Sequence, residues 1–171
     1  MTQSVELTLD DETDRAVREQ WAALAEAGLP TEQRVLPSPS HRPHITLYAG
    51  PTLDSEADER LPGLFAGLRL RFRIGAVLLF GPRRGQVVLV RQVVVGRELL
   101  ALQEAVATLC GASPEGQFGP GRWTPHVTLA RRVPTGQVGA VLTALGEVPE
   151  LDAVSRDGRR WDSDRRETWS L

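Results

Sequence analysis

Two short segments of the chain are nearly identical, and their spacing constrains the fold more than any other feature. Residues 43–47 read Pro-His-Ile-Thr-Leu, and residues 125–129 read Pro-His-Val-Thr-Leu. The two histidines, His44 and His126, lie 82 positions apart (126 − 44) in a chain of 171 residues, and the chain has only three histidines in all. The repeat therefore predicts two halves that each contribute one copy to a shared site.

Each copy is typical of a β-strand, because Ile, Val, Thr and Leu suit that conformation. Residues two apart in a strand point to the same face, so His44 should project beside Thr46, and His126 beside Thr128. A proline just before each histidine fits the first position of a strand, where a missing N–H is tolerated. Each copy would present an imidazole that titrates near neutral pH and a hydroxyl that can donate to an anionic oxygen.

The composition describes an ordinary soluble globular protein, with 41% hydrophobic and 25% charged residues. Its length fits one domain, or two small lobes that share an interface. A net charge of −2 gives no global basic field that would indicate nucleic acid. The single cysteine, Cys110, excludes an intramolecular disulfide and a cysteine-cluster metal site. It falls in an apolar helical run, so we expect a buried, inert thiol.

The first ten residues lack the basic start and the long apolar run of a signal peptide. No segment approaches the roughly 18 apolar residues that a membrane span needs. We therefore expect a cytoplasmic protein, monomeric and without membrane contact.

Strand and helix patterns alternate along the rest of the chain. Alternation of apolar and polar residues predicts strands, and apolar residues at helical spacing predict helices. The expected strands are residues 5–9, the two His strands, 68–74, 76–80 with an interruption at Gly75, 86–95, and the last strands within 148–171 around a turn at Asp157-Gly158. Four helices are expected. The first begins at a cap at Asp10 or Asp11 and ends at Gly28, the second covers residues 54–68, and the third covers residues 97–109. The fourth begins at Pro134-Thr135 and directs Val138, Val141, Leu142 and Leu145 inward.

Loops rich in Pro, Ser and Gly precede both His strands. Residues 29–41 include Pro37, Ser38 and Pro39, and residues 111–122 form the second loop. Because no low-complexity tract separates the halves, we expect residues 1–171 to form one bilobal domain with a cleft between two sheets.

The paired His-x-Thr motifs and this order of elements resemble the 2H phosphoesterase superfamily, most closely its bacterial "2′-5′ RNA ligase" type of RNA 2′,3′-cyclic phosphodiesterase. The resemblance covers most of the chain. It implies an α+β, bilobal fold in which two antiparallel β-sheets line a central cleft, with helices packed outside. The N-terminal strand departs from this branch, which often begins with a more aromatic one.

Carried over onto this sequence, the resemblance makes His44 and His126 the catalytic pair. The first histidine would be the proton donor and the second the proton acceptor. Thr46 and Thr128 match residues that bind phosphoryl oxygens, and Arg131 matches a basic residue often found five positions after the second histidine. Strict strand alternation gives Arg131 the opposite face from Thr128, so it reaches the cleft only if the strand twists or ends there.

This resemblance implies a hydrolase that acts on RNA ends or nucleotides with a cyclic phosphate, yielding 2′-phosphates, with a reverse 2′-5′ RNA ligase reaction by the same groups. Hydrolysis needs a base for water, an acid for the leaving ribose oxygen and donors for the developing charge. Two histidines and two threonines supply these, so no metal or cofactor is expected. The alternative is a binding module of the same fold that holds a nucleotide or RNA without turnover.

A zinc site formed by His41, His44 and His126 is disfavoured. Strand alternation sends His41 and His44 to opposite faces, Pro43 lies between them, and no carboxylate lies near either motif.

Several other side chains have two interpretations. Tyr48 shares the face of His44 and could stack on a base or pack in the core, as could Trp123. The arginine row Arg69, Arg71 and Arg73 could hold RNA phosphates or form a solvated sheet face. The cluster of Arg156, Arg159, Arg160, Arg165 and Arg166, interleaved with acidic residues, is expected to be a solvated hairpin.

Overall fold

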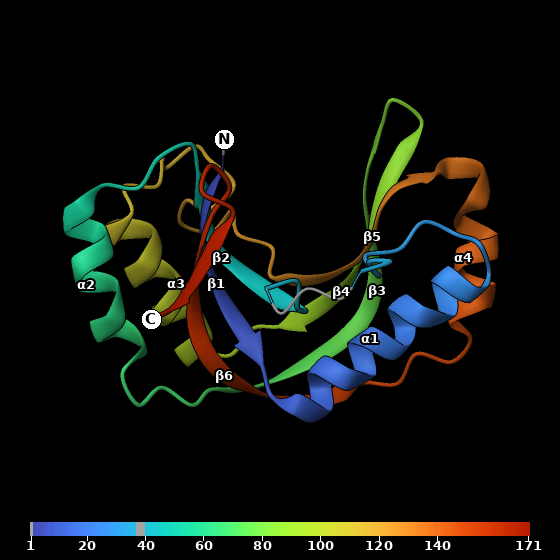
Figure 1. The fold of residues 1–171 in the computed structure, drawn as a ribbon, viewed down its shortest axis with the longest axis horizontal. Helices are drawn as coiled ribbons and strands as arrows, with labels where there is room; N and C mark the ends of the chain where they lie inside the picture. The colour runs from blue at the N-terminus through green and yellow to red at the C-terminus, as the bar shows by residue number, and fades with distance from the viewer. Residues whose placement is uncertain (1, 37–39) are drawn as a thin grey trace.

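The computed structural model describes residues 2–36 and 40–171, and within them strands and helices alternate as Figure 1 shows. Their bounds are β1 (Gln3–Leu9), α1 (Asp11–Glu26), β2 (His44–Gly50), α2 (Ser55–Phe65), β3 (Arg71–Arg83), β4 (Gln86–Val94), α3 (Arg97–Leu109), β5 (His126–Pro134), a 3-10 turn (Thr135–Gln137), α4 (Val138–Leu145), β6 (Leu151–Asp162) and β7 (Glu167–Ser170).

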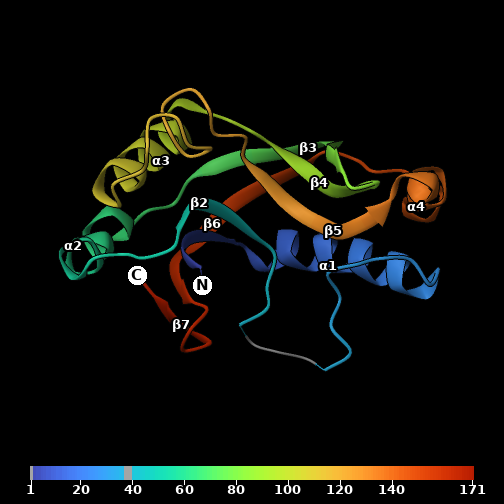
Figure 2. The ribbon, with the colours of Figure 1, turned by 90° about the horizontal axis from the view of Figure 1, so that it is seen from above.

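All strand pairs are antiparallel and follow the order β2-β1-β6-β3-β4-β5, with β7 added on β6. Strand β6 belongs to both lobes: its first part, 151–154, pairs with β3, and 155–162 pairs with β1. The sheet is strongly bent (Figure 1), while α2 and α3 pack at one end and α1 and α4 at the other (Figure 2). The α+β fold with helices outside the cleft is confirmed, and the two sheets are joined through β6.

Helix α1 illustrates how the local sequence builds these lobes. The Asp10 side chain caps it by accepting the backbone N–H groups of Glu12 and Thr13, as expected of an acidic N-cap. The same carboxylate accepts the N–H of Val154, which ties the start of the helix to β6. The apolar face of α1, including Val17 and Leu24, is fully buried.

Three local expectations were wrong. Gly75 does not interrupt β3, which continues through a register irregularity there. The Asp157-Gly158 pair lies inside β6 rather than in a turn. A Cβ atom on Gly158 would lie 2.3 Å from the Phe65 ring, so glycine permits the close approach of α2 to the sheet. Leu142 of α4 is exposed rather than inward, and Val141 is the residue of this helix that is fully buried.

The C-terminal arginines do not form a uniformly solvated hairpin. Arg160 is 2% exposed and its guanidinium binds the Asp58 carboxylate (Nε–Oδ1, 2.5 Å) and Gln3. Arg159 is also mostly buried, against Glu6. Arg165 and Arg166 are exposed, as expected. The predicted loop residues Pro37, Ser38 and Pro39 lie outside the described residues.

The apolar core extends through both lobes and includes the inward-facing residues of the two His strands. Cys110 is half-buried against this core, and burial raises the pKa of its thiol to about 11, so it stays protonated near neutral pH. Within residues 2–36 and 40–171, none of the helices combines the length and apolar character needed to cross a membrane.

Candidate active site

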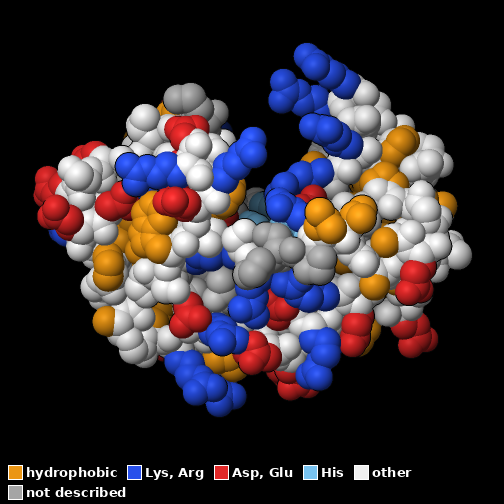
Figure 3. Space-filling view, viewed as in Figure 1, with side chains coloured by type: hydrophobic (Ala, Val, Ile, Leu, Met, Phe, Trp, Pro, Cys, Tyr) orange, Lys and Arg blue, Asp and Glu red, His pale blue; other side chains and the backbone are white. Residues whose placement is uncertain are grey.

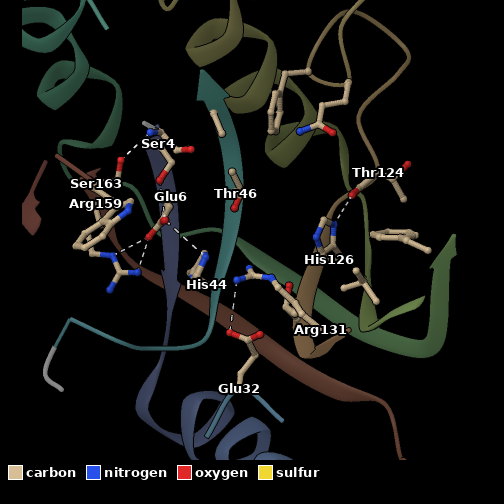
Figure 4. A pocket seen from close by; sticks show the side chains of 18 of the residues that line it. Ser4, Glu6, Glu32, His44, Thr46, Thr124, His126, Arg131, Arg159 and Ser163 are labelled. Carbon is tan, nitrogen blue, oxygen red and sulfur yellow. Dashed lines mark hydrogen bonds and ion pairs between the residues drawn. The ribbon is translucent and has the colours of Figure 1, made fainter. Parts of the chain in front are cut away.

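A pocket of about 820 Å³ lies between the lobes and brings the two sequence repeats together. His44 and Thr46 line it from β2, and His126 lines it from β5 (Figure 4). Thr128 of β5 lines it as well. The inward residues that alternate with them, Ile45, Leu47, Val127 and Leu129, are fully buried in the core. The predicted pairing of each histidine with its threonine on one face is therefore what the structure shows.

A β-bulge follows the motif in β2. Thr46 and Tyr48 pair with consecutive residues of β1, so Leu47 is an extra residue in the strand. The bulge reverses the alternation of side chains, and Ala49 rather than Tyr48 lines the pocket. Tyr48 is 8% exposed and packs beside Phe118, with ring centroids 5.8 Å apart. The expectation that Tyr48 shares the face of His44 and contacts substrate was wrong.

The second motif has a bulge at the equivalent position. Thr128 and Ala130 pair with consecutive residues of β4, so Leu129 is the extra residue of β5. Ala130 consequently turns into the core and Arg131 lines the pocket. The Arg131 guanidinium lies 3.6 Å from the Glu32 carboxylate. The bulge thus brings Arg131 to the cleft despite the strict alternation that argued against it.

The two imidazoles are held in the same way. Nδ1 of His44 lies 2.7 Å from the carbonyl oxygen of Arg42, and Nδ1 of His126 lies 2.8 Å from that of Thr124. Each carbonyl belongs to the residue two positions earlier and can only accept, so Nδ1 is the donor in both rings. This fixes the tautomer and leaves Nε2 of each neutral imidazole free to accept a proton.

A buried carboxylate approaches only the first histidine. Oε1 of Glu6, from β1, lies 3.6 Å from Nε2 of His44, and Glu6 is 5% exposed. Arg159 donates to the other carboxylate oxygen, and the Ser4 hydroxyl donates to Oε1 at 2.8 Å. Burial would raise the pKa of Glu6, but the charges of His44 and Arg159 and these hydrogen bonds hold it below its usual value.

The second histidine has an apolar neighbour instead. The Phe80 ring meets the His126 ring edge-on, with centroids 4.8 Å apart. Burial is the main reason that the pKa of His126 lies below the ordinary histidine value, and the charges of His44 and Arg131 lower it further, although the hydrogen bond to Thr124 opposes them. The site therefore favours a neutral His126 near pH 7.

A tryptophan side chain donates a hydrogen bond to the backbone of each His strand. The Trp123 Nε1–H donates to the backbone carbonyl of Thr46, and the Trp21 Nε1–H donates to that of Thr128, each at 3.0 Å. Trp123 also lines the pocket. Its indole is thus held by a backbone contact while one surface faces the cleft.

The remaining sequence candidates differ in their contacts. His41 also lines the pocket, but its ring stacks on Trp21, with centroids 5.2 Å apart, and its Nε2 contacts the Glu32 carbonyl at 2.6 Å. In the described part of the chain, no group of three His, Cys, Asp or Glu side chains could hold a metal ion. The row Arg69, Arg71 and Arg73 is exposed and does not line the pocket, and Arg73 pairs with Glu150 at 2.9 Å.

Sequence reasoning missed Glu6 and Arg159. The alternation of residues 5–9 places Glu6 on the polar side of a strand, and the acidic residues around Arg159 predict a solvated hairpin. The available signal was topological: β1 lies between β2 and β6 and is buried along its whole length. A charged residue in such a strand needs a partner, and β6 supplies it.

An α+β fold whose two lobes each face the cleft with a His-x-Thr strand is that of a 2H phosphoesterase. The family model of the 2′-5′ RNA ligase superfamily matches residues 13–160, and the chain belongs to that family of phosphoesterases and ligases. No curated protein matches the chain.

Solved structures share the fold over nearly the whole chain. The protein TT0787 of Thermus thermophilus is 18% identical, with a TM-score of 0.59 over 100% of this chain and 95% of that one. Kluyveromyces marxianus Usb1 is 10% identical, with a TM-score of 0.57 over 99% and 97%. E. coli LigT complexed with 3′-AMP is 17% identical, with a TM-score of 0.51 over 99% and 92%.

Proposed function

We propose that this protein is a metal-independent phosphodiesterase that hydrolyses 2′,3′-cyclic phosphates of RNA ends or nucleotides. The observation that carries the proposal is the matched tethering of His44 and His126: each Nδ1 is bound to a backbone carbonyl, and both rings line one pocket. Two imidazoles with a free Nε2 can act as the acid and the base of a phosphodiester cleavage.

The surroundings of the two histidines assign their roles. His126 has a lowered pKa, so it is neutral near pH 7 and acts as the base. Oε1 of Glu6 lies 3.6 Å from Nε2 of His44, so a proton donor at this nitrogen would face a carboxylate, and we assign His44 as the acid. This order agrees with the roles that the family resemblance implies.

In the proposed reaction, Nε2 of His126 removes a proton from water as the water oxygen forms a bond to phosphorus. The bond between phosphorus and the ribose 3′ oxygen breaks, and Nε2–H of His44 donates its proton to that oxygen. The product is a 2′-phosphate, with the 3′ hydroxyl restored. The hydroxyls of Thr46 and Thr128 and the Arg131 guanidinium would stabilise the charge on the non-bridging oxygens.

The same groups can join two strands when a 5′ hydroxyl of a second strand replaces water. Its oxygen then bonds to phosphorus as the bond to the ribose 3′ oxygen breaks, and a 2′-5′ linkage forms. E. coli LigT has been solved with 3′-AMP, which supports a nucleotide as the class of ligand for this fold. The volume of about 820 Å³ is ample for a nucleotide.

The test is hydrolysis of cytidine 2′,3′-cyclic monophosphate in the presence of EDTA. Wild type should turn over, and His44→Ala and His126→Ala should each lose roughly 10²- to 10⁴-fold in kcat. Arg71→Ala, on an exposed part of β3 away from the pocket, is the control and should retain full activity. Activity that EDTA abolishes contradicts the metal-free mechanism, and tight nucleotide binding without turnover indicates a binding module instead.

A further inference from the structure

Charge is unevenly distributed between the two walls of the cleft. Residues 61–97, which include β3 and β4, contain seven arginines and no acidic residue. Residues 116–146, which include β5, contain three arginines and no acidic residue. All 22 Asp and Glu residues lie elsewhere, so a chain of net charge −2 has one wall built from strands that carry only positive charge.

The β3–β4 hairpin concentrates this charge at its tip. Arg83 and Arg84 are exposed there, and Arg132 is exposed at the neighbouring end of β5. None of these three, which we call the basic rim, forms an ion pair within 4.0 Å with any residue that the structure describes. Their charges are therefore available to a ligand.

The backbone at two rim positions is unusual. Arg84 has φ 52° and Arg132 has φ 58°, in the left-handed region that normally favours Gly, Asn or Asp. Arg84 and Gly85 (φ 72°) form the two-residue turn of the hairpin. Arginine is a poor residue for this conformation, which Arg166 in the turn between β6 and β7 also adopts (φ 56°).

The rim continues the wall of the active site. Phe80 and Val88, on the same hairpin, line the pocket that holds the histidines. Arg83 lies three residues beyond Phe80, which is about 10 Å along a strand. Figure 3 shows basic side chains on the projecting hairpin, beside the hollow between the lobes.

The opposite wall does not offer the same charge. Residues 157–167 contain four arginines and four acidic residues, so their charges cancel. Arg159 is bound by Glu6, and Arg165 lies 3.9 Å from Asp162. These acidic partners reduce the attraction of that wall for a polyanion. A polyanion that extends out of the pocket is therefore attracted toward the wall formed by β3, β4 and β5.

We infer that the basic rim of Arg83, Arg84 and Arg132 binds backbone phosphates of a single-stranded RNA whose 3′-terminal cyclic phosphate occupies the histidine pocket. This inference rests on the proposed function. A terminal cyclic phosphate lets the strand leave the site in one direction only. The span of about 10 Å corresponds to roughly three nucleotides of stacked strand, so the rim selects an oligonucleotide over a mononucleotide.

The experiment compares two substrates: cytidine 2′,3′-cyclic monophosphate and a single-stranded RNA of about ten nucleotides that ends in a 2′,3′-cyclic phosphate. The test variant is Arg83→Ala/Arg84→Ala. The matched control is Arg69→Ala/Arg71→Ala, which removes the same charge from exposed positions before and at the start of β3, outside the pocket. Thermal melts verify that both variants fold.

For the oligonucleotide, the test variant should raise KM about tenfold, and the slope of log affinity against log salt should become less negative by about 1.4, for two lost phosphate contacts on a single strand. Turnover of the mononucleotide should be unchanged, and the control should behave as wild type with both substrates. An unchanged KM and salt slope in the test variant, or an equal loss in the control, overturns the inference.

Failure of the proposed function is distinguishable, because wild type would then hydrolyse neither substrate. Fluorescence anisotropy with a labelled RNA of the same length that ends in a 3′-phosphate measures binding without turnover. A loss of affinity confined to the test variant supports the rim in that case, and equal affinities of wild type and the test variant overturn it.

Discussion

A buried carboxylate lies against one of two histidines that are otherwise held alike. Both rings donate Nδ1–H to the carbonyl two residues earlier, and both follow a proline in the same five-residue motif. Glu6 and Phe80 break this symmetry, since one adds a negative charge beside His44 and the other an apolar ring beside His126. The proposed division into acid and base therefore comes from residues outside the repeat.

The first prediction concerns Glu6→Gln. The carboxylate of Glu6 lies 3.6 Å from Nε2 of His44, the nitrogen that donates the proton in the proposed reaction. Loss of its charge removes this electrostatic support, so kcat should fall about tenfold while KM changes little. Steady-state kinetics at neutral pH measure this. Glu32→Gln, which removes another carboxylate of the pocket, should lower kcat much less; an equal loss in both variants would contradict a specific role of Glu6 beside His44.

The second prediction concerns Phe80→Ala. Burial lowers the pKa of His126 below the ordinary histidine pKa of about 6.5. As pH falls, the base therefore becomes protonated only below that pH, and the acidic limb of kcat/KM should lie below about pH 6.5. Removal of the Phe80 ring exposes the His126 imidazole to water, so part of the lowering of its pKa is lost. The acidic limb should therefore move to higher pH. NMR titration of the His126 ring protons follows the change directly. An unchanged His126 titration would contradict burial as the cause.

At the scale of elements, the two His strands share a bulge one residue after the threonine. Both bulges turn the next residue into the core and the one after it to the pocket, where Ala49 and Arg131 lie. In both strands the carbonyl of the threonine at the bulge accepts an indole N–H. The structural repeat is thus longer than the sequence repeat, because each His strand also has a bulge and a supporting tryptophan. The sequence does not reveal this, since the two tryptophans come from unrelated positions.

The third prediction compares Trp21→Phe with Trp123→Phe. Each removes the N–H that satisfies a threonine carbonyl, and a buried carbonyl without a partner costs about 1–3 kcal/mol. Trp21 is 4% exposed, whereas Trp123 is half-buried, where water can replace the donor. The Trp21 variant should therefore lose more of the free energy of unfolding in urea. Equal losses would mean that water access does not decide the effect.

Local patterns predicted the elements well where local contacts determine them. Residues 97–109 form α3 as expected, and Asp10 caps α1. The failures have non-local causes. Tyr48 is in the core because of a bulge that is defined by pairing with β1. Gly158 is in a strand because it pairs with Leu7 of β1, and the Phe65 ring of α2 packs against it. Glu6 and Arg159 meet across 153 positions of sequence, and no local pattern indicates such a pair.

At the scale of the whole molecule, β6 is the strand that both lobes share. It pairs with β3 through its first residues and with β1 through the rest. The two histidines lie on strands at the opposite ends of the sheet order, β2 and β5. Their relative placement depends on the bend of the sheet across β6, so we propose that residues 1–171 fold and unfold as one unit.

The last prediction tests this unit with Gly158→Ala. A Cβ atom at this position would lie 2.3 Å from the Phe65 ring, so α2 must shift away from β6 at a cost of about 1–3 kcal/mol. If β6 couples the lobes, scanning calorimetry should show a single transition at lower temperature, with equal calorimetric and van't Hoff enthalpies. Gly63→Ala is the control: it lies in α2 with no atom within 4 Å of the added Cβ, and it should be neutral or stabilise the protein by up to about 1 kcal/mol. Two separate transitions in the Gly158→Ala variant would show that the lobes unfold independently, and the sheet bend would then have to be maintained by contacts other than β6.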